Sequence, residues 1–212
     1  RIVNLEGNAV KRQVEKQRKL RASGSLIEWL EDFYRSLDSK IRDEFGPVFR
    51  SFAQAVVDEA TEELGVDFSR AEFDAWVSGY LDAYAARHIG SSLGQLRELA
   101  EESDDEVEKR VNEWEETRPD KISGNESTRM GAGIYQAVAF AAGLSTVWRI
   151  RGSETCPYCK ALSGKRVMRG QSYFQGGEDH EPDGADSGAM KIRGKVMHPP
   201  LHRGCDCYVS AV

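Results

Sequence analysis

The sequence predicts an α+β protein: an elongated α-helical N-terminal region followed by a small α/β C-terminal domain with short antiparallel strands. Apolar side chains recur every three or four residues over most of positions 25–142, which is typical of amphipathic helices. Beyond Gly143 the apolar spacing changes to two, as in a β-strand. All four cysteines lie in the last third, in two short clusters joined by a segment that is rich in glycine and poor in apolar residues.

The composition is that of a soluble, well-solvated chain. Charged residues make up 30% of its 212 residues and hydrophobic residues 40%, with a formal net charge of -6. No apolar run approaches the roughly 20 residues that a membrane-spanning helix needs, so we expect no membrane partner. The acidic excess lies in residues 1–146, whereas residues 147–212 hold ten basic and seven acidic residues. This balance argues against a dedicated nucleic-acid-binding protein but allows one local phosphate-binding face.

Breaks in these patterns divide the chain into a basic N-terminal arm or linker at 1–24, a helical domain at 25–120 and a C-terminal domain at 121–212. Residues 11–21 carry six basic side chains and one acidic one. If this stretch is helical, its charges point almost all round and leave no clean apolar face. We therefore expect a solvated helix or flexible linker, with contact to nucleic acid or to an acidic partner surface as the alternative.

Two long apolar stripes begin the helical domain, one over residues 26–45 and one over residues 48–64. Gly46-Pro47 separates them, which predicts either a kinked rod or a helical hairpin. Gly65 fits the position just beyond the last turn of a helix. Ser25 and Glu28 have the spacing of a capping box at the start of the first stripe.

A third helix is expected from Ser69 to about Ile89, with Glu72 completing a second capping box. The strongly acidic residues 98–116 keep a thin apolar stripe and are interpreted as a solvated helix face. Residues 118–124 are expected to form a loop and a hinge between the two halves of the chain. A helix rich in small residues, capped at Asn125 or Ser127, then leads to Gly143.

Short strands are expected in the C-terminal domain. Alternation in residues 146–151 predicts a strand that leads directly into the first cysteine cluster. Residues 165–168 and 195–197 are expected to form strands that can pair with this first strand. Residues 207–209 are expected to form a last short strand. The Gly- and Asp-rich residues 175–189 are expected to form a mobile loop.

The two cysteine clusters offer the ligands of a structural zinc ion. A Cys-x-x-Cys segment and a His-x-x-Cys-x-Cys segment supply five soft donors for a four-coordinate, tetrahedral site. Gly204 lets the backbone turn so that His202 and Cys205 point at one centre. The preferred ligands are Cys156, Cys159, His202 and Cys205, with Cys207 as the alternative to His202 and His198 as a weaker candidate. Four protein ligands leave no position for water, so the expected Zn²⁺ is structural and stabilises the C-terminal domain.

One or two disulfides that close the same loop are the alternative. Four cysteines in 212 residues fall short of the density of a small secreted disulfide scaffold, and no signal peptide is visible. A redox-active Cys-x-x-Cys would be expected beside a βαβ pattern, which the sequence lacks. Zinc is therefore the preferred interpretation.

Several motifs of the C-terminal part follow one another in a specific order. They are Glu126-Ser127-Thr128-Arg129, the small-residue helix, Val147-Trp148, Thr155-Cys156-Pro157-Tyr158-Cys159, Leu162, Gly164-Lys165, and Pro200 with His202, Cys205 and Cys207. Over residues 125–212 this pattern resembles the phage Mu F-like head morphogenesis family, the minor head or minor capsid proteins of tailed phages and prophages. Two places depart from the family pattern. Gly152-Ser153-Glu154-Thr155 stands where an Asp and an Arg are usual, and Asp206 stands where an Arg is usual between the last two cysteines.

The resemblance implies a structural component of the phage head, found in the virion and, during assembly, in the host cytoplasm. It implies a role in head morphogenesis and in genome packaging or delivery, as part of a larger assembly. The implied partners are the portal protein, the major capsid protein or both, and phage DNA is a further candidate.

We expect no enzymatic activity. A zinc deaminase needs His-x-Glu before Pro-Cys-x-x-Cys, whereas here the proline lies inside the cluster and no His-x-Glu precedes it. A zinc-dependent nuclease would have to use His180, His198 and the acids near Asp179, and it remains an alternative, as does a DNA-binding module. The candidate DNA contacts are Lys165, Arg166, Arg169, Lys191, Arg193 and Lys195, for which an ordinary charged surface is the simpler interpretation.

Overall fold

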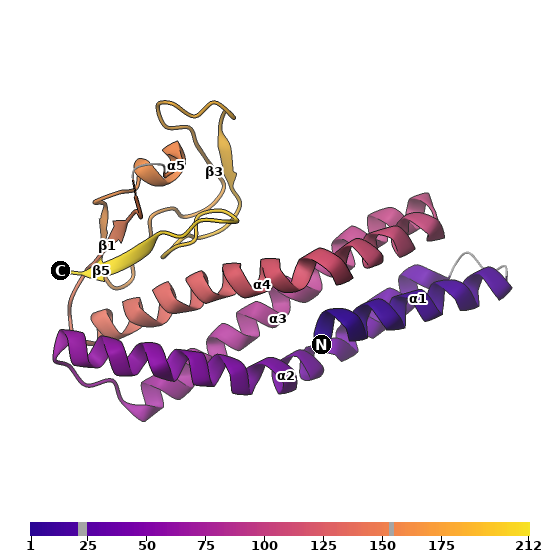
Figure 1. Cartoon of the computed structure of the whole chain (residues 1–212), viewed down its shortest axis with the longest axis horizontal. Helices are drawn as coiled ribbons and strands as arrows, with labels where there is room; N and C mark the ends of the chain where they lie inside the picture. The colour runs from indigo at the N-terminus through magenta and orange to yellow at the C-terminus, as the bar shows by residue number, and fades with distance from the viewer. Residues whose placement is uncertain (21–24, 153–154) are drawn as a thin grey trace. The chain divides into compact units, whose positions relative to one another are not determined.

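The computed structural model describes residues 1–20, 25–152 and 155–212 (Figure 1). The long helices of this part are α1 (Ile2–Leu20), α2 (Ser25–Leu64), α3 (Arg70–Glu102) and α4 (Asp104–Ala141). They are followed by β1 (Thr146–Arg149), the short α5 (Pro157–Lys160), β2 (Arg166–Val167), β3 (Glu178–His180), β4 (Met190–Ile192) and β5 (Tyr208–Ala211). The predicted order of a helical N-terminal region and a small antiparallel sheet region is confirmed.

Two compact units divide the chain, and each is built from two separated segments. The first unit comprises Arg1–Arg50 and Val77–Ile122, and the second comprises Ser51–Trp76 and Ser123–Val212. A change of unit therefore falls close to the boundary predicted near residue 120. The second unit, however, also takes residues 51–76, because α2, α3 and α4 each contribute a part to both units.

The predicted apolar stripes form the core of the first unit. The stripe of α2 is buried at every helical repeat, at Leu26, Leu30, Tyr34, Leu37 and Ile41. Aromatic rings join α2 to α3, since the ring of Phe49 lies 5.6 Å from that of Tyr80 and 5.1 Å from that of Tyr84. These aromatic side chains of α3 are thus part of the helix–helix core.

The described helices run through three positions at which the sequence suggested a kink, an end or a loop, and at Gly46-Pro47 this excludes the hairpin and leaves the rod. α2 continues through Gly46-Pro47, α3 through Gly90, and α4 through Pro119 and the expected loop at 118–124. A proline inside a helix removes one backbone hydrogen bond. Pro47 and Pro119 are both exposed, so the carbonyl group that loses its partner lies on the solvent side of the helix.

Two helix ends follow the predicted chemistry. The backbone N–H of Ser69 donates to Glu72 Oε2 at 2.9 Å, and the N–H of Glu72 donates to Ser69 Oγ at 3.2 Å, which completes a capping box before α3. Gly65 follows α2 with a φ of +62°, a conformation that glycine adopts without strain. The prediction that Ser127 caps a helix is wrong, because this residue lies inside α4, where its hydroxyl donates to the carbonyl of Ser123 at 2.6 Å.

The expectation of a solvated or flexible basic arm is also wrong for residues 2–20, because they form α1 and bury one of its faces. That face consists of Ile2, Val3, Glu6, Gly7, Val10, Val14 and Gln17. The basic side chains meet the acidic stretch of α4: Lys11 Nζ lies 2.7 Å from Glu115 Oε2, and an Arg18 guanidinium nitrogen lies 2.8 Å from Glu108 Oε2. The acidic surface that the basic run contacts is thus part of the same chain. Residues 21–24 of the predicted arm lie outside the described residues.

In the second unit, two small sheets follow α4. The first has the strand order β2-β1-β5, with both pairings antiparallel, and the second pairs β3 with β4. The predicted pairing of residues 165–168 with the first strand is confirmed through β2. Residues 195–197 were expected to do the same, but Val196 pairs with Phe174 instead. The segment 175–189, expected to be a mobile loop, contains β3.

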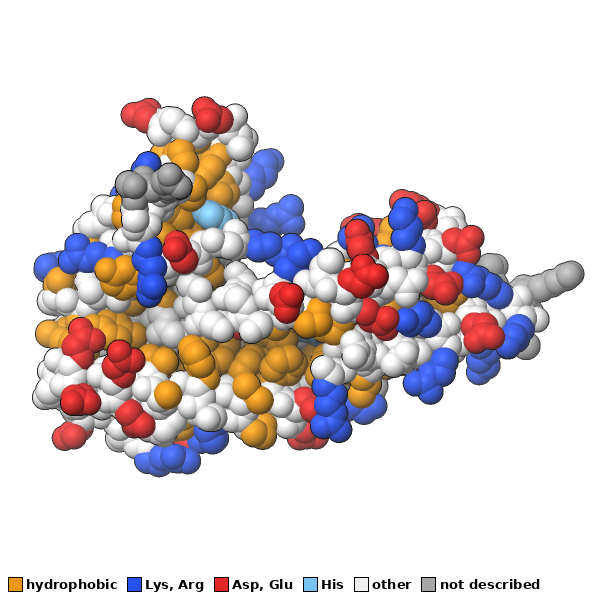
Figure 2. Space-filling model, in the orientation of Figure 1, with side chains coloured by type: hydrophobic (Ala, Val, Ile, Leu, Met, Phe, Trp, Pro, Cys, Tyr) orange, Lys and Arg blue, Asp and Glu red, His pale blue; other side chains and the backbone are white. Residues whose placement is uncertain are grey.

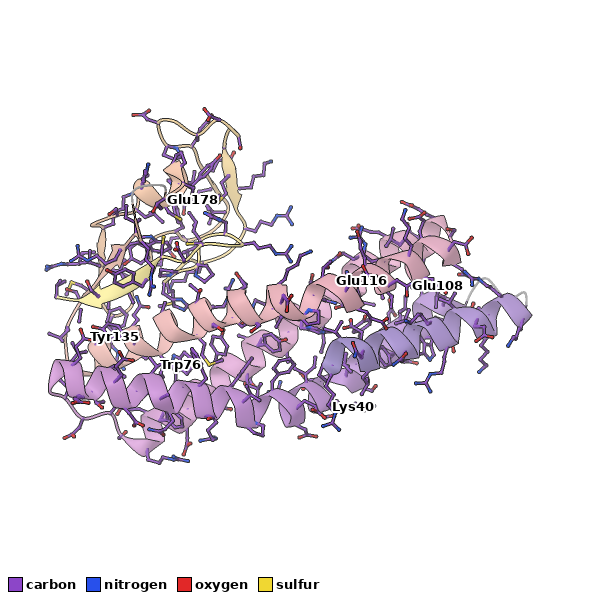
Figure 3. The ribbon with its side chains drawn as sticks, viewed as in Figure 1. Lys40, Trp76, Glu108, Glu116, Tyr135 and Glu178 are labelled. Atoms are coloured by element: carbon purple, nitrogen blue, oxygen red, sulfur yellow. The ribbon has the colours of Figure 1, made fainter. Side chains whose placement is uncertain are left out.

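Polar side chains of α4 attach the first sheet to the helix. Gln136 Nε2 donates to Thr146 Oγ1 and to the carbonyl of Met197, both at 2.9 Å. Tyr135 donates its hydroxyl proton to Glu63 Oε1 at 3.2 Å and accepts from the N–H of Ala211 at 3.4 Å (Figure 3). Through these contacts α4 fixes the start of β1 and the end of β5, between which the cysteine clusters lie.

Candidate metal centre

The sheet and α5 bring the two cysteine clusters together. Cys156 stands just before α5 and Cys159 lies inside it, in a turn closed by the N–H of Cys159 donating to the carbonyl of Cys156 at 3.1 Å. His202 and Cys205 lie in the segment that leads into β5, and Cys207 directly precedes that strand. Because β5 pairs with β1, the second cluster returns beside the strand that leads to the first. Gly204 has a φ of +75° and makes the predicted turn between His202 and Cys205.

The donor atoms meet around Cys159. Cys156 Sγ lies 3.0 Å and Cys159 Sγ 3.4 Å from His202 Nε2, and Cys159 Sγ lies 3.5 Å from Cys205 Sγ. Zinc bonds of about 2.3 Å to sulfur and about 2.0 Å to nitrogen, at tetrahedral angles, would separate the donors by roughly 3.5–3.8 Å. The two groups that could hold a metal ion share Cys159: it stands with Cys156 and His202 in one and with Cys205 and Cys207 in the other.

The imidazole of His202 is oriented for ligation. Its Nδ1 lies 2.9 Å from the carbonyl oxygen of Arg203, and a carbonyl can only accept a hydrogen bond. Nδ1 therefore carries the proton, and in the neutral ring Nε2 presents its lone pair to the thiols. A backbone carbonyl on the far nitrogen is the usual support of a metal-bound histidine.

The thiols have opposed pKa values. The contact with Cys159 lowers the pKa of Cys205 to about 5, and the same contact, together with burial, holds the pKa of Cys159 well above its ordinary value. Burial raises the pKa of Cys207 to about 11. Burial also opposes ionisation of Cys156, but the N–H of Cys159 and the imidazole of His202 outweigh it and lower that pKa. The cluster thus binds protons unevenly, whereas a divalent cation would favour the thiolate at every position.

The thiols also belong to the small core of the sheet region. Cys159, Cys205 and Cys207 are buried and pack with Trp148, Leu162, Phe174 and Ile192. The indole ring of Trp148 is fully buried, and its N–H has no hydrogen-bond partner of normal geometry. Trp148 was assigned only to a strand by the sequence, although its place just before the first cluster was a usable signal.

The structure does not join the sulfur atoms of the four cysteines, all of which are free thiols. A disulfide requires a sulfur–sulfur distance of about 2.05 Å, compared with the 3.5 Å between Cys159 and Cys205. The cluster is therefore a set of separate donors, and the disulfide alternative is not what this structure contains.

The other candidate histidines are not members of the thiol cluster. His180 Nε2 lies 3.0 Å from the carbonyl of Tyr158, and His198 Nδ1 lies 2.7 Å from the carbonyl of Pro199. Neither histidine belongs to a metal-binding group among the described residues. The nuclease residues Asp179 and His180 lie on β3, with Asp179 exposed.

The six candidate DNA-contacting residues are all exposed, and they fall on two different sheets. Lys165, Arg166 and Arg169 lie in and beside β2, and Lys191, Arg193 and Lys195 lie in and beside β4. Figure 2 shows basic side chains gathered over the C-terminal sheet region. Exposure fits both a phosphate-binding face and an ordinary charged surface, so the DNA contact stays a prediction.

No family model, curated protein or solved structure matches this chain. The likeness to the Mu F-like family therefore rests on the order and spacing of the sequence motifs. Of the two departures from that pattern, Asp206 is exposed, while residues 153–154 lie outside the described residues. None of the described helices combines the length and the apolar character needed to cross a membrane.

Proposed function

We propose that this chain is a minor head protein of the phage Mu F-like type, a structural component that acts in head assembly and in genome packaging or delivery. In this proposal a structural Zn²⁺ bound by Cys156, Cys159, His202 and Cys205 stabilises the C-terminal sheet region. The portal protein, the major capsid protein or both are its partners. The observation that carries the proposal is that two motif clusters, 46 positions apart in sequence, meet at Cys159, whose sulfur lies 3.4 Å from His202 Nε2 and 3.5 Å from Cys205 Sγ.

The donor set favours zinc over harder cations. Three thiols and one imidazole are soft ligands that select zinc, whereas magnesium and calcium take oxygen ligands. Because these four ligands fill a tetrahedral site, they leave no position for a water molecule to react. The metal would thus have a structural role, which supports an assembly component over an enzyme.

A structural ion meets a physical need of this region. Its core contains only a few large apolar side chains, and three of the buried members are cysteines. Its strands are two to four residues long, too short to be stable alone. Binding a metal to groups that come together only in the folded state adds the binding free energy to folding.

The metal part is tested by elemental analysis of the full chain, purified under reducing conditions. We expect about one zinc per chain, as for a single four-ligand site. Removal by a strong chelator should lower the melting temperature of the sheet region while the far-ultraviolet signal of the helices persists. Metal-free protein with an unchanged melting profile would contradict the structural role.

The assembly part is tested separately, with the portal protein and the major capsid protein encoded in the same genome. We expect the zinc-loaded chain to co-purify with at least one of them. A Lys40→Ala chain, which changes an exposed residue outside the metal site, is the control for nonspecific effects of substitution. A Cys156→Ala chain shows whether the metal site is needed for binding. Failure to bind either protein, with zinc at full stoichiometry, would overturn the assembly role and leave the metal site standing.

A further inference from the structure

A groove of about 500 Å³ opens in the second unit beside β5. One wall is the end of α2, with Val56, Glu59 and Glu63, and another is the part of α4 that carries Tyr135. The third side is formed by five consecutive residues, 206–210, which lead into and form most of β5. All of these residues belong to the same unit.

The groove runs along the open edge of the first sheet. β5 is the last strand in the order β2-β1-β5, so only one of its edges is paired. Ser145 and Val212 exchange both backbone hydrogen bonds, at 3.1 and 2.9 Å. Such pairs alternate along an antiparallel ladder, so Ser210 and Tyr208 face β1 and Val209 directs its N–H and C=O to the open edge. The N–H of Ala211, on the same edge, is already taken by the hydroxyl of Tyr135.

The groove lining is acidic. Its charged members are the carboxylates of Glu59, Glu63 and Asp206 and the single guanidinium of Arg151. Arg151 lies over the ring of Tyr208, with its guanidinium carbon 5.5 Å from the ring centre. Burial, with the charge of Glu63 adding to it, raises the pKa of Tyr135, which faces the groove. Figure 2 shows acidic side chains gathered over the end of α2 that forms this wall.

We propose that this groove binds an extended, basic segment of a partner protein, which adds to β5 as a further strand. The open N–H and C=O of Val209 would pair with the backbone of the segment, as in other cases of strand addition to a sheet edge. A Lys or Arg side chain of the segment would lie among Glu59, Glu63 and Asp206, while Val56 and Tyr208 would contact its apolar side chains. Phosphate-bearing ligands do not fit, because this lining would repel them.

This inference goes beyond the assembly role, and the observations that carry it do not involve a bound metal. The open edge follows from the strand order, and the acidic wall comes from α2, far from the thiol cluster in sequence. The two observations are independent, and both specify the same ligand: the edge requires an extended backbone and the wall requires a positive charge.

The experiment uses the full, zinc-loaded chain and a blocked hexapeptide of alternating valine and lysine. Binding is measured by calorimetry, and the amide signal of Val209 is followed by NMR. Two control peptides test how the segment binds. In the first, glutamate replaces lysine, which tests the charge. The second is N-methylated on alternate residues, so that one edge of its backbone cannot donate hydrogen bonds. We expect saturable binding of the lysine peptide alone, with a shift of the Val209 amide.

Two matched variants locate the charge. Glu59→Lys places a positive charge in the groove, whereas Glu62→Lys makes the same change on an exposed residue of α2 outside it. We expect Glu59→Lys to weaken binding roughly tenfold and Glu62→Lys to change it less than about twofold. Both residues are exposed, so equal melting temperatures show that the fold is kept.

The proposal is overturned if the lysine peptide does not bind, if the N-methylated or glutamate peptide binds equally well, or if both variants weaken binding alike. Analytical ultracentrifugation of the chain without peptide tests whether a second copy of the chain occupies the groove instead. A dimer that Glu59→Lys dissociates and Glu62→Lys does not would assign the groove to a second copy of this chain and would also overturn a foreign partner.

Discussion

Cys159 Sγ and Cys205 Sγ lie 3.5 Å apart, although 46 positions separate them in the sequence. The segment between them contains β2, β3 and β4 but little apolar material, so this contact closes a long loop around a small core. Closing a loop of this length has an entropic cost that the few buried side chains must offset. A metal ion shared by the two ends would supply the missing free energy.

The first prediction separates the roles of the last two cysteines. Cys205→Ser removes a donor that lies beside Cys159, so zinc affinity should fall by more than the roughly 10–100-fold typical of losing a supporting group. Cys207→Ser should stay within that range, because the proposed ligand set is complete without it. Competition with a chromophoric chelator measures both affinities. Equal losses, or a larger loss for Cys207→Ser, would make Cys207 a ligand and replace His202 in the set.

A second polar cluster holds the first unit together. The carboxylate of Glu6 on α1 is fully buried; it accepts from the hydroxyl of Tyr34 on α2 at 2.5 Å and lies 3.1 Å from Nε2 of His88 on α3. Arg118 on α4 approaches both carboxylate oxygens at 3.5 Å and lies over the ring of Trp114. Each of the four long helices thus contributes to one buried network.

This network predicts loss of stability in acid. Burial of the Glu6 carboxyl opposes its ionisation, but His88 and Arg118 outweigh burial and lower its pKa below the ordinary value of 4.5. A lowered pKa in the folded state stabilises the fold above about pH 4.5, and this contribution is lost as the pH falls through the folded pKa. Denaturant unfolding at several pH values should show the free energy of unfolding falling below pH 4.5. A Glu6→Gln chain should lack this part of the pH dependence.

The same substitution tests the network at neutral pH. Glu6→Gln removes the charge that the buried His88 and Arg118 face, so we expect a loss of about 3–5 kcal/mol in the free energy of unfolding. Glu98→Gln on α3 is the matched control, because Glu98 is exposed, and it should change stability by less than about 0.5 kcal/mol. Similar small effects of both substitutions would show that the network is not a main determinant of the fold.

α1 shows why part of the fold could not be predicted from the sequence. Its buried face includes Glu6 and Gln17 among apolar residues. The sequence of α1 therefore shows no continuous apolar stripe at helical spacing. The partners of Glu6 lie on three other helices and are 28, 82 and 112 positions away. Polar groups of this kind can be recognised as core only when those partners are known. His88 was likewise expected near a helix end, whereas α3 continues to Glu102 and buries it.

The meeting of the two cysteine clusters could be predicted, because cysteine and histidine at metal-ligand spacing can be recognised by residue type alone. The helix interruptions could not, since local preference is weaker than packing. The sequence allowed a hairpin at Pro47 and predicted a loop at Pro119, but a long helix that packs on both sides of an exposed proline tolerates one missing hydrogen bond. Pairing of Val196 with Phe174 instead of β1 depends on chain reversals that the sequence did not specify.

The last prediction concerns the close approach of Gly133 on α4 to the segment before the second cysteine cluster. A Cβ atom at this position would lie 2.9 Å from Nε2 of His198 and 3.2 Å from the ring of Trp76. Real Cβ atoms almost never come as close as the first distance, so the His198 ring would have to shift, and the ring of Trp76 would be in tight contact as well. Gly133→Ala should therefore destabilise the second unit by about 1–3 kcal/mol, as overpacking of a core does.

Gly124→Ala is the control, because it places the same methyl group on the same helix with nothing within 4 Å. There the gain in helix propensity acts alone and should stabilise the chain by about 0.5–1 kcal/mol. Thermal unfolding of both variants, with zinc content measured beside it, gives two opposite signs if α4 supports the sheet region through this contact. A stabilising Gly133→Ala would mean that the His198 segment is free to move away from α4, and the helix would then not fix the position of the second cluster.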